Sequence, residues 1–149
     1  MLILKFIFQG WPETAALIFL AFSMVGYKPN LRESVSYSLL LVTIIYLFRM
    51  PSIPFGLHTI VGVITLVILV YRVTKVSLGI SFLAAFSTYL ILAFMETLFS
   101  FLFEQLIGNI SMSQGWLWII VGWPQILGLV GSAIVIRKIH PILIKKVVK

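Results

Sequence analysis

Residues 78–106 read LGISFLAAFSTYLILAFMETLFSFLFEQL, and this stretch decides the fold because it is apolar almost throughout. A helix over these residues extends about 43 Å at a rise of 1.5 Å per residue, whereas the hydrocarbon core of a bilayer is roughly 30 Å thick. The stretch therefore predicts a membrane-spanning helix that tilts strongly or projects beyond the lipid.

Four further apolar stretches flank this one, at residues 2–26, 31–48, 55–71 and 116–136. Hydrophobic residues make up 61% of the 149-residue chain and charged residues 10%, against roughly 25% charged in soluble domains. A soluble domain of this length could not bury so much apolar surface. We therefore predict an all-α membrane protein with five transmembrane helices, which form a bundle over residues 1–136. A basic tail over residues 137–149, broken by Pro141, follows the bundle.

Two prolines fall inside these stretches. Pro12 followed by Glu13 is a helix-start signature, and a helix from Pro12 to residue 26 would extend only about 22 Å. We expect residues 2–8 to supply the missing length, as a kinked continuation or an interfacial turn. Pro124 deprives the Ile120 carbonyl of its hydrogen-bond donor, so a kink is expected in the last helix.

The basic residues predict the orientation. With five crossings, nine of the 11 Lys and Arg residues lie on one side of the membrane, and only Lys5 and Arg49 lie on the other. The nine are Lys28, Arg32, Arg72, Lys75, Arg137, Lys138, Lys145, Lys146 and Lys149. The positive-inside rule then places the N-terminus outside and the C-terminus in the cytoplasm of a multi-pass protein of the bacterial inner or plasma membrane.

The basic tail is expected to lie on the cytoplasmic leaflet. Its charges, carried by Arg137, Lys138, Lys145, Lys146 and Lys149, alternate with apolar residues and can attract anionic lipid. Docking of a soluble cytoplasmic partner is the alternative. Nucleic-acid binding is not expected, because the basic residues sit in short segments beside apolar runs.

Glu96 is the most informative single residue, because it interrupts the apolar run of residues 90–103. A carboxylate within the bilayer costs at least about 2.5 kcal/mol on insertion scales unless it is paired or neutral. It is either a ligand, proton or ion site, or a buried carboxyl that ties two helices together. In both cases Arg49 or His58 is the expected contact.

Further polar residues fall toward the same outer side. The candidate ligand-binding residues are Glu13, Arg49, His58, Glu96 and Gln125. Each has a simpler structural explanation, such as a cap on a helix dipole or a solvated loop end. Their convergence on one side predicts an outward-facing polar pocket, whose floor is closed by a pair between Glu96 and Arg49 or His58.

An internal echo links the first and last helices. Residues 10–13 read Gly-Trp-Pro-Glu and residues 122–125 read Gly-Trp-Pro-Gln, and both copies run from outside to inside. A parallel repeat is one interpretation. Coincidence between two proline-containing helices is favoured, because the intervening residues scarcely match.

Small residues also recur at helical spacing in two helices. They are Ser77, Ser81 and Ala85 in one, and Gly128, Gly131 and Ser132 in the other. Such spacing permits close helix contact, either within one bundle or in a homo-oligomer or with a membrane partner.

Signatures of catalysis are missing from the sequence. Cysteine is absent, which excludes thiolate metal sites and cysteine nucleophiles. There is no metalloprotease, serine-hydrolase or phosphate-binding motif. We therefore expect no enzyme, no catalytic residue, no cofactor and no metal.

Several short motifs resemble the N-terminal membrane sensor region of Gram-positive histidine kinases of the peptide-pheromone (accessory-gene-regulator) type. They are Pro12-Glu13, residues 46–51 running into 54–59, and Pro124-Gln125, and the resemblance covers nearly the whole chain. No dimerising phosphoacceptor helix or ATP domain follows, and His140 precedes Pro141, which suits no phosphoacceptor helix. The resemblance implies a sensor module without its kinase, or one that acts through a separate cytoplasmic signalling partner.

We therefore expect a membrane protein that senses or binds a ligand from the outer side. One alternative is a small transporter or transporter subunit, with Glu96 as its coupling carboxylate and Pro124 as a hinge. A second alternative is a scaffold or assembly subunit whose polar groups only hold helices together.

Overall fold

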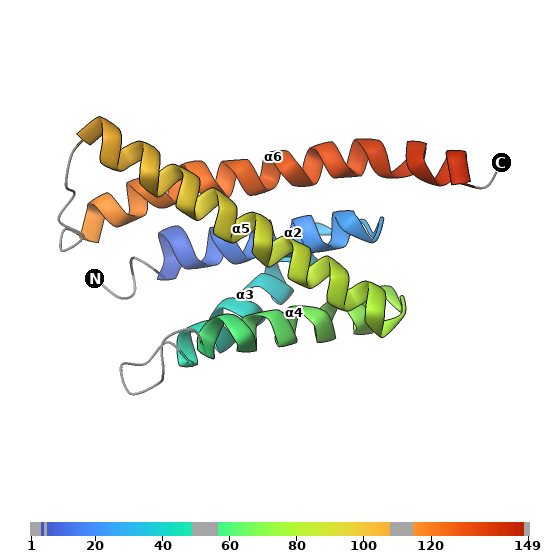
Figure 1. Cartoon of the computed structure of the whole chain (residues 1–149). Helices are drawn as coiled ribbons and strands as arrows, with labels where there is room; N and C mark the ends of the chain where they lie inside the picture. Colours follow the sequence, from blue (N-terminus) through green and yellow to red (C-terminus); the bar gives the residue numbers. More distant parts are fainter. Residues whose placement is uncertain (1–3, 5, 49–56, 108–114, 148–149) are drawn as a thin grey trace.

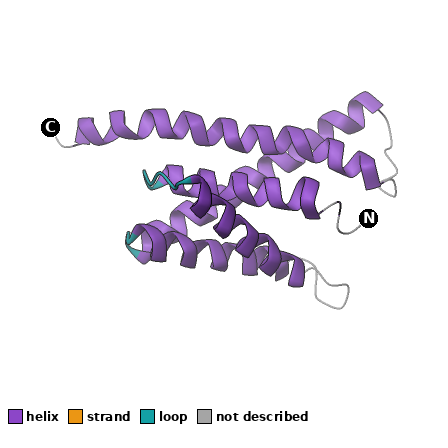
Figure 2. Ribbon diagram, turned by 180° about the vertical axis from the view of Figure 1, so that it is seen from behind, coloured by secondary structure: helices purple, strands orange, loops and turns teal. Residues whose placement is uncertain are grey.

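The computed structural model describes residue 4 and residues 6–48, 57–107 and 115–147 (Figure 1). Every regular element in these ranges is helical, which confirms the predicted all-α class (Figure 2). A π-helical turn, η1 (Phe6–Gly10), leads into α2 (Trp11–Met24). The remaining helices are α3 (Leu31–Leu47), α4 (Leu57–Thr74), α5 (Leu78–Ile107) and α6 (Gly115–Val147).

The five α-helices alternate in direction (Figure 1). We call the end at which α2, α4 and α6 begin the N-terminal end of the bundle, and the opposite end the C-terminal end. Helix α2 lies at the centre and packs against each of the other four α-helices, most extensively against α6. Its Phe22, Leu20 and Ile18 side chains are completely buried.

Three helices are long and apolar enough to cross a membrane within the described residues, namely Phe6–Met24, Leu57–Thr74 and Leu78–Leu106. Helix α5 also exposes large apolar side chains along its length, among them Phe82, Phe86 and Phe94. Exposed apolar surface of this extent is costly in water and favourable against lipid. These features support a membrane protein.

The first helix departs from α-helical geometry ahead of Pro12. Proline has no N–H, and its ring clashes with the carbonyl four residues earlier, here that of Phe8. A regular α-turn therefore cannot close at this point, and the wider π-helical turn η1 joins directly to α2. The sequence predicted a kinked continuation or an interfacial turn over residues 2–8, of which residues 6–8 belong to η1 and residues 2, 3 and 5 lie outside the described residues.

The C-terminal end of the bundle has well-satisfied helix ends. Helix α2 ends where Gly26 adopts a left-handed φ of 73°, and the N–H of Tyr27 donates to the Phe22 carbonyl at 2.9 Å. Helix α3 begins with a capping box, in which the Glu33 N–H donates to Asn30 Oδ1 at 2.8 Å and Glu33 Oε2 accepts from the Asn30 N–H at 3.1 Å. Both arrangements satisfy backbone groups that a helix end would leave unpaired.

Helix α6 differs from its predicted extent. The sequence predicted an end at residue 136 and a separate tail broken by Pro141, but the helix continues to Val147. A proline inside a helix removes one backbone hydrogen bond and bends the chain without necessarily ending the helix.

The small residues of α5 pack within the chain. Ser81 and Ala85 are completely buried, as is Thr88 one turn further on. On α6, a Cβ at Gly128 would lie 3.0 Å from Sδ of Met95, whereas a Cβ at Gly131 would meet no atom within 4 Å. Ser81 and Ala85 therefore serve contacts inside the bundle and are not available to a second copy.

Candidate ligand-binding cavity

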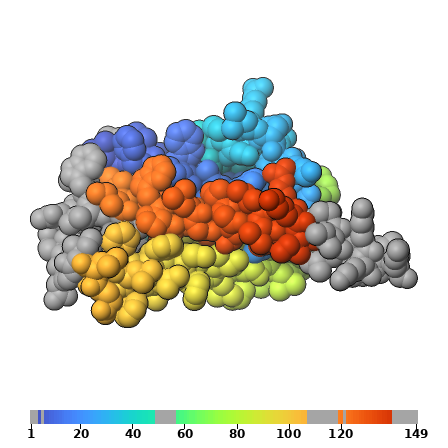
Figure 3. All heavy atoms as spheres, turned by 90° about the horizontal axis from the view of Figure 1, so that it is seen from above, coloured from blue at the N-terminus to red at the C-terminus, as the bar shows by residue number. Residues whose placement is uncertain are grey.

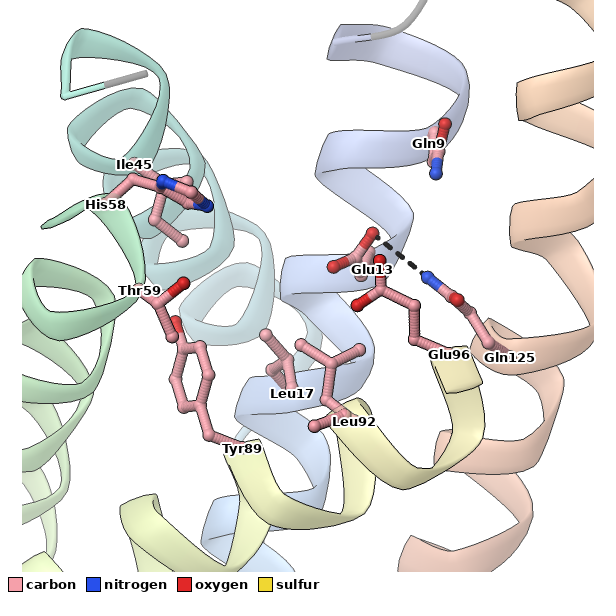
Figure 4. A pocket seen from close by; sticks show the side chains of 11 residues that line it. Gln9, Glu13, Leu17, Ile45, His58, Thr59, Tyr89, Leu92, Glu96 and Gln125 are labelled. Atoms are coloured by element: carbon pink, nitrogen blue, oxygen red, sulfur yellow. Dashed lines mark hydrogen bonds between the residues drawn. The ribbon is translucent and has the colours of Figure 1, made fainter. Parts of the chain in front are cut away.

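A cavity of about 230 Å³ lies toward the N-terminal end of the bundle (Figure 4). Every helical element contributes to its wall. The lining residues are Gln9, Glu13, Leu17, Ile45, His58, Thr59, Tyr89, Leu92, Ala93, Glu96 and Gln125. A cavity among five helices with several polar side chains is the usual form of a small-molecule site.

The course of α5 explains why the cavity forms there. Helix α5 crosses the bundle diagonally, and it packs against α4 and against α6 (Figure 1). Its Tyr89 hydroxyl lies against Gly62 of α4, and its Met95 lies against Gly128 of α6. The cavity lies beside residues 89–96 of α5, the segment that contains both of these contacts and Glu96.

Four of the five predicted ligand-binding residues line this one cavity: Glu13, His58, Glu96 and Gln125. They come from α2, α4, α5 and α6, so only the folded bundle brings them together. Gln125 Nε2 donates a hydrogen bond of 3.5 Å to Glu13 Oε2 (Figure 4). Arg49 lies outside the described residues, so its contact with Glu96 stays a prediction, as does the contact between Glu96 and His58.

The two Gly-Trp-Pro motifs lie on neighbouring helices beside the cavity. Glu13 and Gln125, which are hydrogen-bonded, are the fourth residues of their motifs. The neighbouring helices α2 and α6 run in the same direction, so equivalent positions lie at the same level of the bundle (Figure 1). The two similar motifs in the sequence therefore also occupy similar positions in the bundle, whether they arose by duplication or by coincidence.

Sequence reasoning missed Gln9 as a site residue. This side chain is only 8% exposed, and its amide points into the cavity (Figure 4). It packs against Gly122 of α6, where an added Cβ would lie 2.7 Å from Gln9 Nε2. No hydrogen bond joins the Gln9 side chain to another described residue, although a buried amide normally has several partners. Its position before a Gly-Trp-Pro motif was the available signal.

Tyr89 was missed as well. Its hydroxyl oxygen is buried and has no hydrogen-bond partner among the described residues. An unpaired buried hydroxyl costs roughly 1–3 kcal/mol, and this one packs against Gly62 of α4. The surrounding sequence is apolar and gives no indication of which way this ring points.

Toward the C-terminal end, the cavity is closed by tightly packed apolar side chains. Leu17 and Leu92 line it directly. Beyond them, the completely buried residues of two apolar clusters fill the interior: Ile18, Leu20, Leu41, Leu66 and Leu129. The buried hydroxyls toward this end, Ser23 and Ser81, donate to the Phe19 and Ser77 carbonyls one turn earlier and so have partners.

The arrangement is rich in hydrogen-bond acceptors. The Glu13 and Glu96 carboxyl groups offer acceptor oxygens, and the amides of Gln9 and Gln125 and the Thr59 hydroxyl offer donors as well as acceptors. Among the described residues, no group of three or more His, Cys, Asp or Glu side chains is placed to hold a metal ion.

The basic residues predicted for the membrane surface lie away from the cavity. Lys138 is exposed, and the Arg137 guanidinium carbon lies 5.7 Å from the centroid of the Phe19 ring, within reach of a cation–π interaction. The side chains of Lys145, Lys146 and Lys149 lie outside the described set. Their membrane contact stays a prediction.

Comparison of the chain with protein-family models, with curated proteins and with solved structures finds no match.

Proposed function

We propose that this chain is a five-span membrane protein, with its N-terminus outside and its C-terminus in the cytoplasm, that binds an extracellular ligand in the cavity. The observation that carries the proposal is the convergence of Glu13, His58, Glu96 and Gln125 from four helices on one cavity. If these groups served only as separate caps and solvated ends, the fold would not need to gather them. Ionisable groups within a membrane protein are functional candidates by default.

The charge distribution supports the orientation. Most described basic side chains lie toward the C-terminal end of the bundle, where α2 and α4 end and α3 and α5 begin. They are Lys28, Arg32, Arg72, Lys75, Arg137 and Lys138. The positive-inside rule makes this the cytoplasmic end, so the cavity faces the other side.

The course of α6 favours ligand binding and sensing over transport. Sensing requires only that the bound state changes the cytoplasmic end of the protein. Helix α6 contributes Gln125 to the cavity and continues to Val147. A displacement at the site would therefore move the cytoplasmic end of one continuous helix, where a separate signalling partner would detect it.

Substituted-cysteine accessibility tests the proposal without background, because the chain contains no cysteine. In intact cells, Thr59→Cys in the cavity wall should react with a membrane-impermeant thiol reagent. Lys28→Cys at the opposite end is the control and should react only after permeabilisation. Labelling of Lys28→Cys and not of Thr59→Cys in intact cells would contradict the proposal.

A further inference from the structure

The cavity carries more acceptor and acidic character than a generic polar site. Its charged and titratable groups are Glu13 from α2, His58 from α4 and Glu96 from α5. The elements η1 and α6 contribute the neutral amides of Gln9 and Gln125, and α3 contributes the apolar Ile45. Figure 4 shows both carboxylates directed into the cavity.

A second and independent observation points to a missing ligand. Gln9 is more than nine-tenths buried, lines the cavity, and makes no hydrogen bond to another described residue. Its amide offers an acceptor oxygen, which a donor in the cavity would stabilise.

The local backbone is built to hold Gln9 in this position. The π-helical turn η1 ahead of Pro12 carries the side chain, and π-helical turns are frequent at functional sites. Gly122 has no side chain, and the Gln9 amide occupies the space that a Cβ would fill. An inward-pointing amide that is held from both sides, and that has no hydrogen-bond partner among the described residues, has the properties of a ligand contact.

From these observations we propose that the cavity binds the ammonium group of a small organic cation. An ammonium group has three donors and no acceptor, which complements two carboxylates and the surrounding amide and hydroxyl oxygens. Since no cluster of three metal-ligating side chains occurs in the described residues, a tightly held metal ion fits this set less well. The volume of about 230 Å³ equals that of about eight water molecules, which suits an amine of a few carbon atoms.

This inference rests on the proposed function and specifies the class of its ligand. It is tested with the full chain carrying Thr59→Cys, labelled in intact cells with a cationic or an anionic methanethiosulfonate reagent. The labelling rate with the cationic reagent, divided by the rate with the anionic reagent, should be about tenfold higher than the same ratio for a free thiol. A unit charge within several ångströms changes the local concentration of a charged reagent by about that factor. Butylammonium should slow labelling, whereas butanol and butyrate should not.

Variants of the acids identify the source of this preference. Glu96→Gln should reduce the ratio several-fold, and Glu96→Asp, which retains the charge, should preserve it. Glu104→Gln is the matched control, because Glu104 is exposed on the same helix and does not line the cavity.

The outcomes separate this inference from the proposed function. Efficient labelling with no preference for the cationic reagent would overturn the ammonium site and leave the outward-open cavity standing. Protection by butyrate in place of butylammonium would do the same. Absence of labelling by either reagent would contradict the open cavity itself, and the ammonium site would fall with it.

Discussion

The two ends of this bundle use the same helices in opposite ways. Toward the C-terminal end, the interior is apolar, as around Phe22 and Leu66, and the ends of α2 and α3 are closed by backbone and side-chain hydrogen bonds. Toward the N-terminal end, the buried Gln9 side chain and the buried Tyr89 hydroxyl lie near half-buried Glu13 and exposed Glu96, and the first two have no hydrogen-bond partner among the described residues. Buried polar groups cost free energy when they are unpaired, so folding alone does not explain them. The comparison places the completely buried apolar side chains at one end and the polar cavity, to which we assign the proposed binding, at the other.

Figure 3 shows α5 and α6 side by side across the face in view, next to parts of α2 and α3. The side chains of α5 have different surroundings. Its exposed phenylalanines suit lipid, whereas Tyr89, Leu92 and Glu96 line the cavity.

The largest expected effect comes from truncating the apolar core. Phe22 is completely buried and makes edge-on contacts with the Tyr27 and Tyr37 rings. Phe22→Ala should reduce the free energy of unfolding by about 3–5 kcal/mol, through lost burial and the cavity left behind. Thermal unfolding in detergent measures the change. The control is Phe86→Ala on the lipid-facing side, and an equal loss there would break the distinction between core and surface.

A smaller effect is expected at the capping box. Asn30→Ala removes the side-chain acceptor for the Glu33 N–H and should destabilise the protein by about 1 kcal/mol. Thermal unfolding, with Ser36→Ala as an exposed control on the same helix, checks this. A loss no greater than that of the control would show that the cap does not contribute to closing the C-terminal end.

The smallest effect on stability is expected at the cavity, where it is most informative. Gln125 is 6% exposed, but its recorded hydrogen bond to Glu13 is long, at 3.5 Å. Gln125→Leu keeps the volume and removes a buried polar group, so stability should change by less than about 1 kcal/mol or increase. Protection of Thr59→Cys by butylammonium should nevertheless weaken. A loss comparable to that of Phe22→Ala would mean that the cavity is a structural network and not a binding site.

Much of the fold follows from the sequence, because long apolar runs leave few alternatives to membrane-spanning helices. The four described residues that line the cavity could also be predicted, since each is a polar residue that the five-helix arrangement places toward the same side. Gln9 and Tyr89 could not, because only the π-helical turn and the diagonal course of α5 turn them inward. Asn30 and Glu33 carried a recognisable capping-box spacing that was not used. Pro141 was misleading, because a proline bends a helix as readily as it ends one.

The central claim is that the cavity end lies outside the cell and the basic end lies in the cytoplasm, and fusion of a reporter to the C-terminus tests it most directly. A fluorescent protein that matures only in the cytoplasm should be active there, and alkaline phosphatase, which requires export, should be inactive. Active alkaline phosphatase at the C-terminus, together with a dark fluorescent fusion, would contradict the orientation on which the proposed binding site depends.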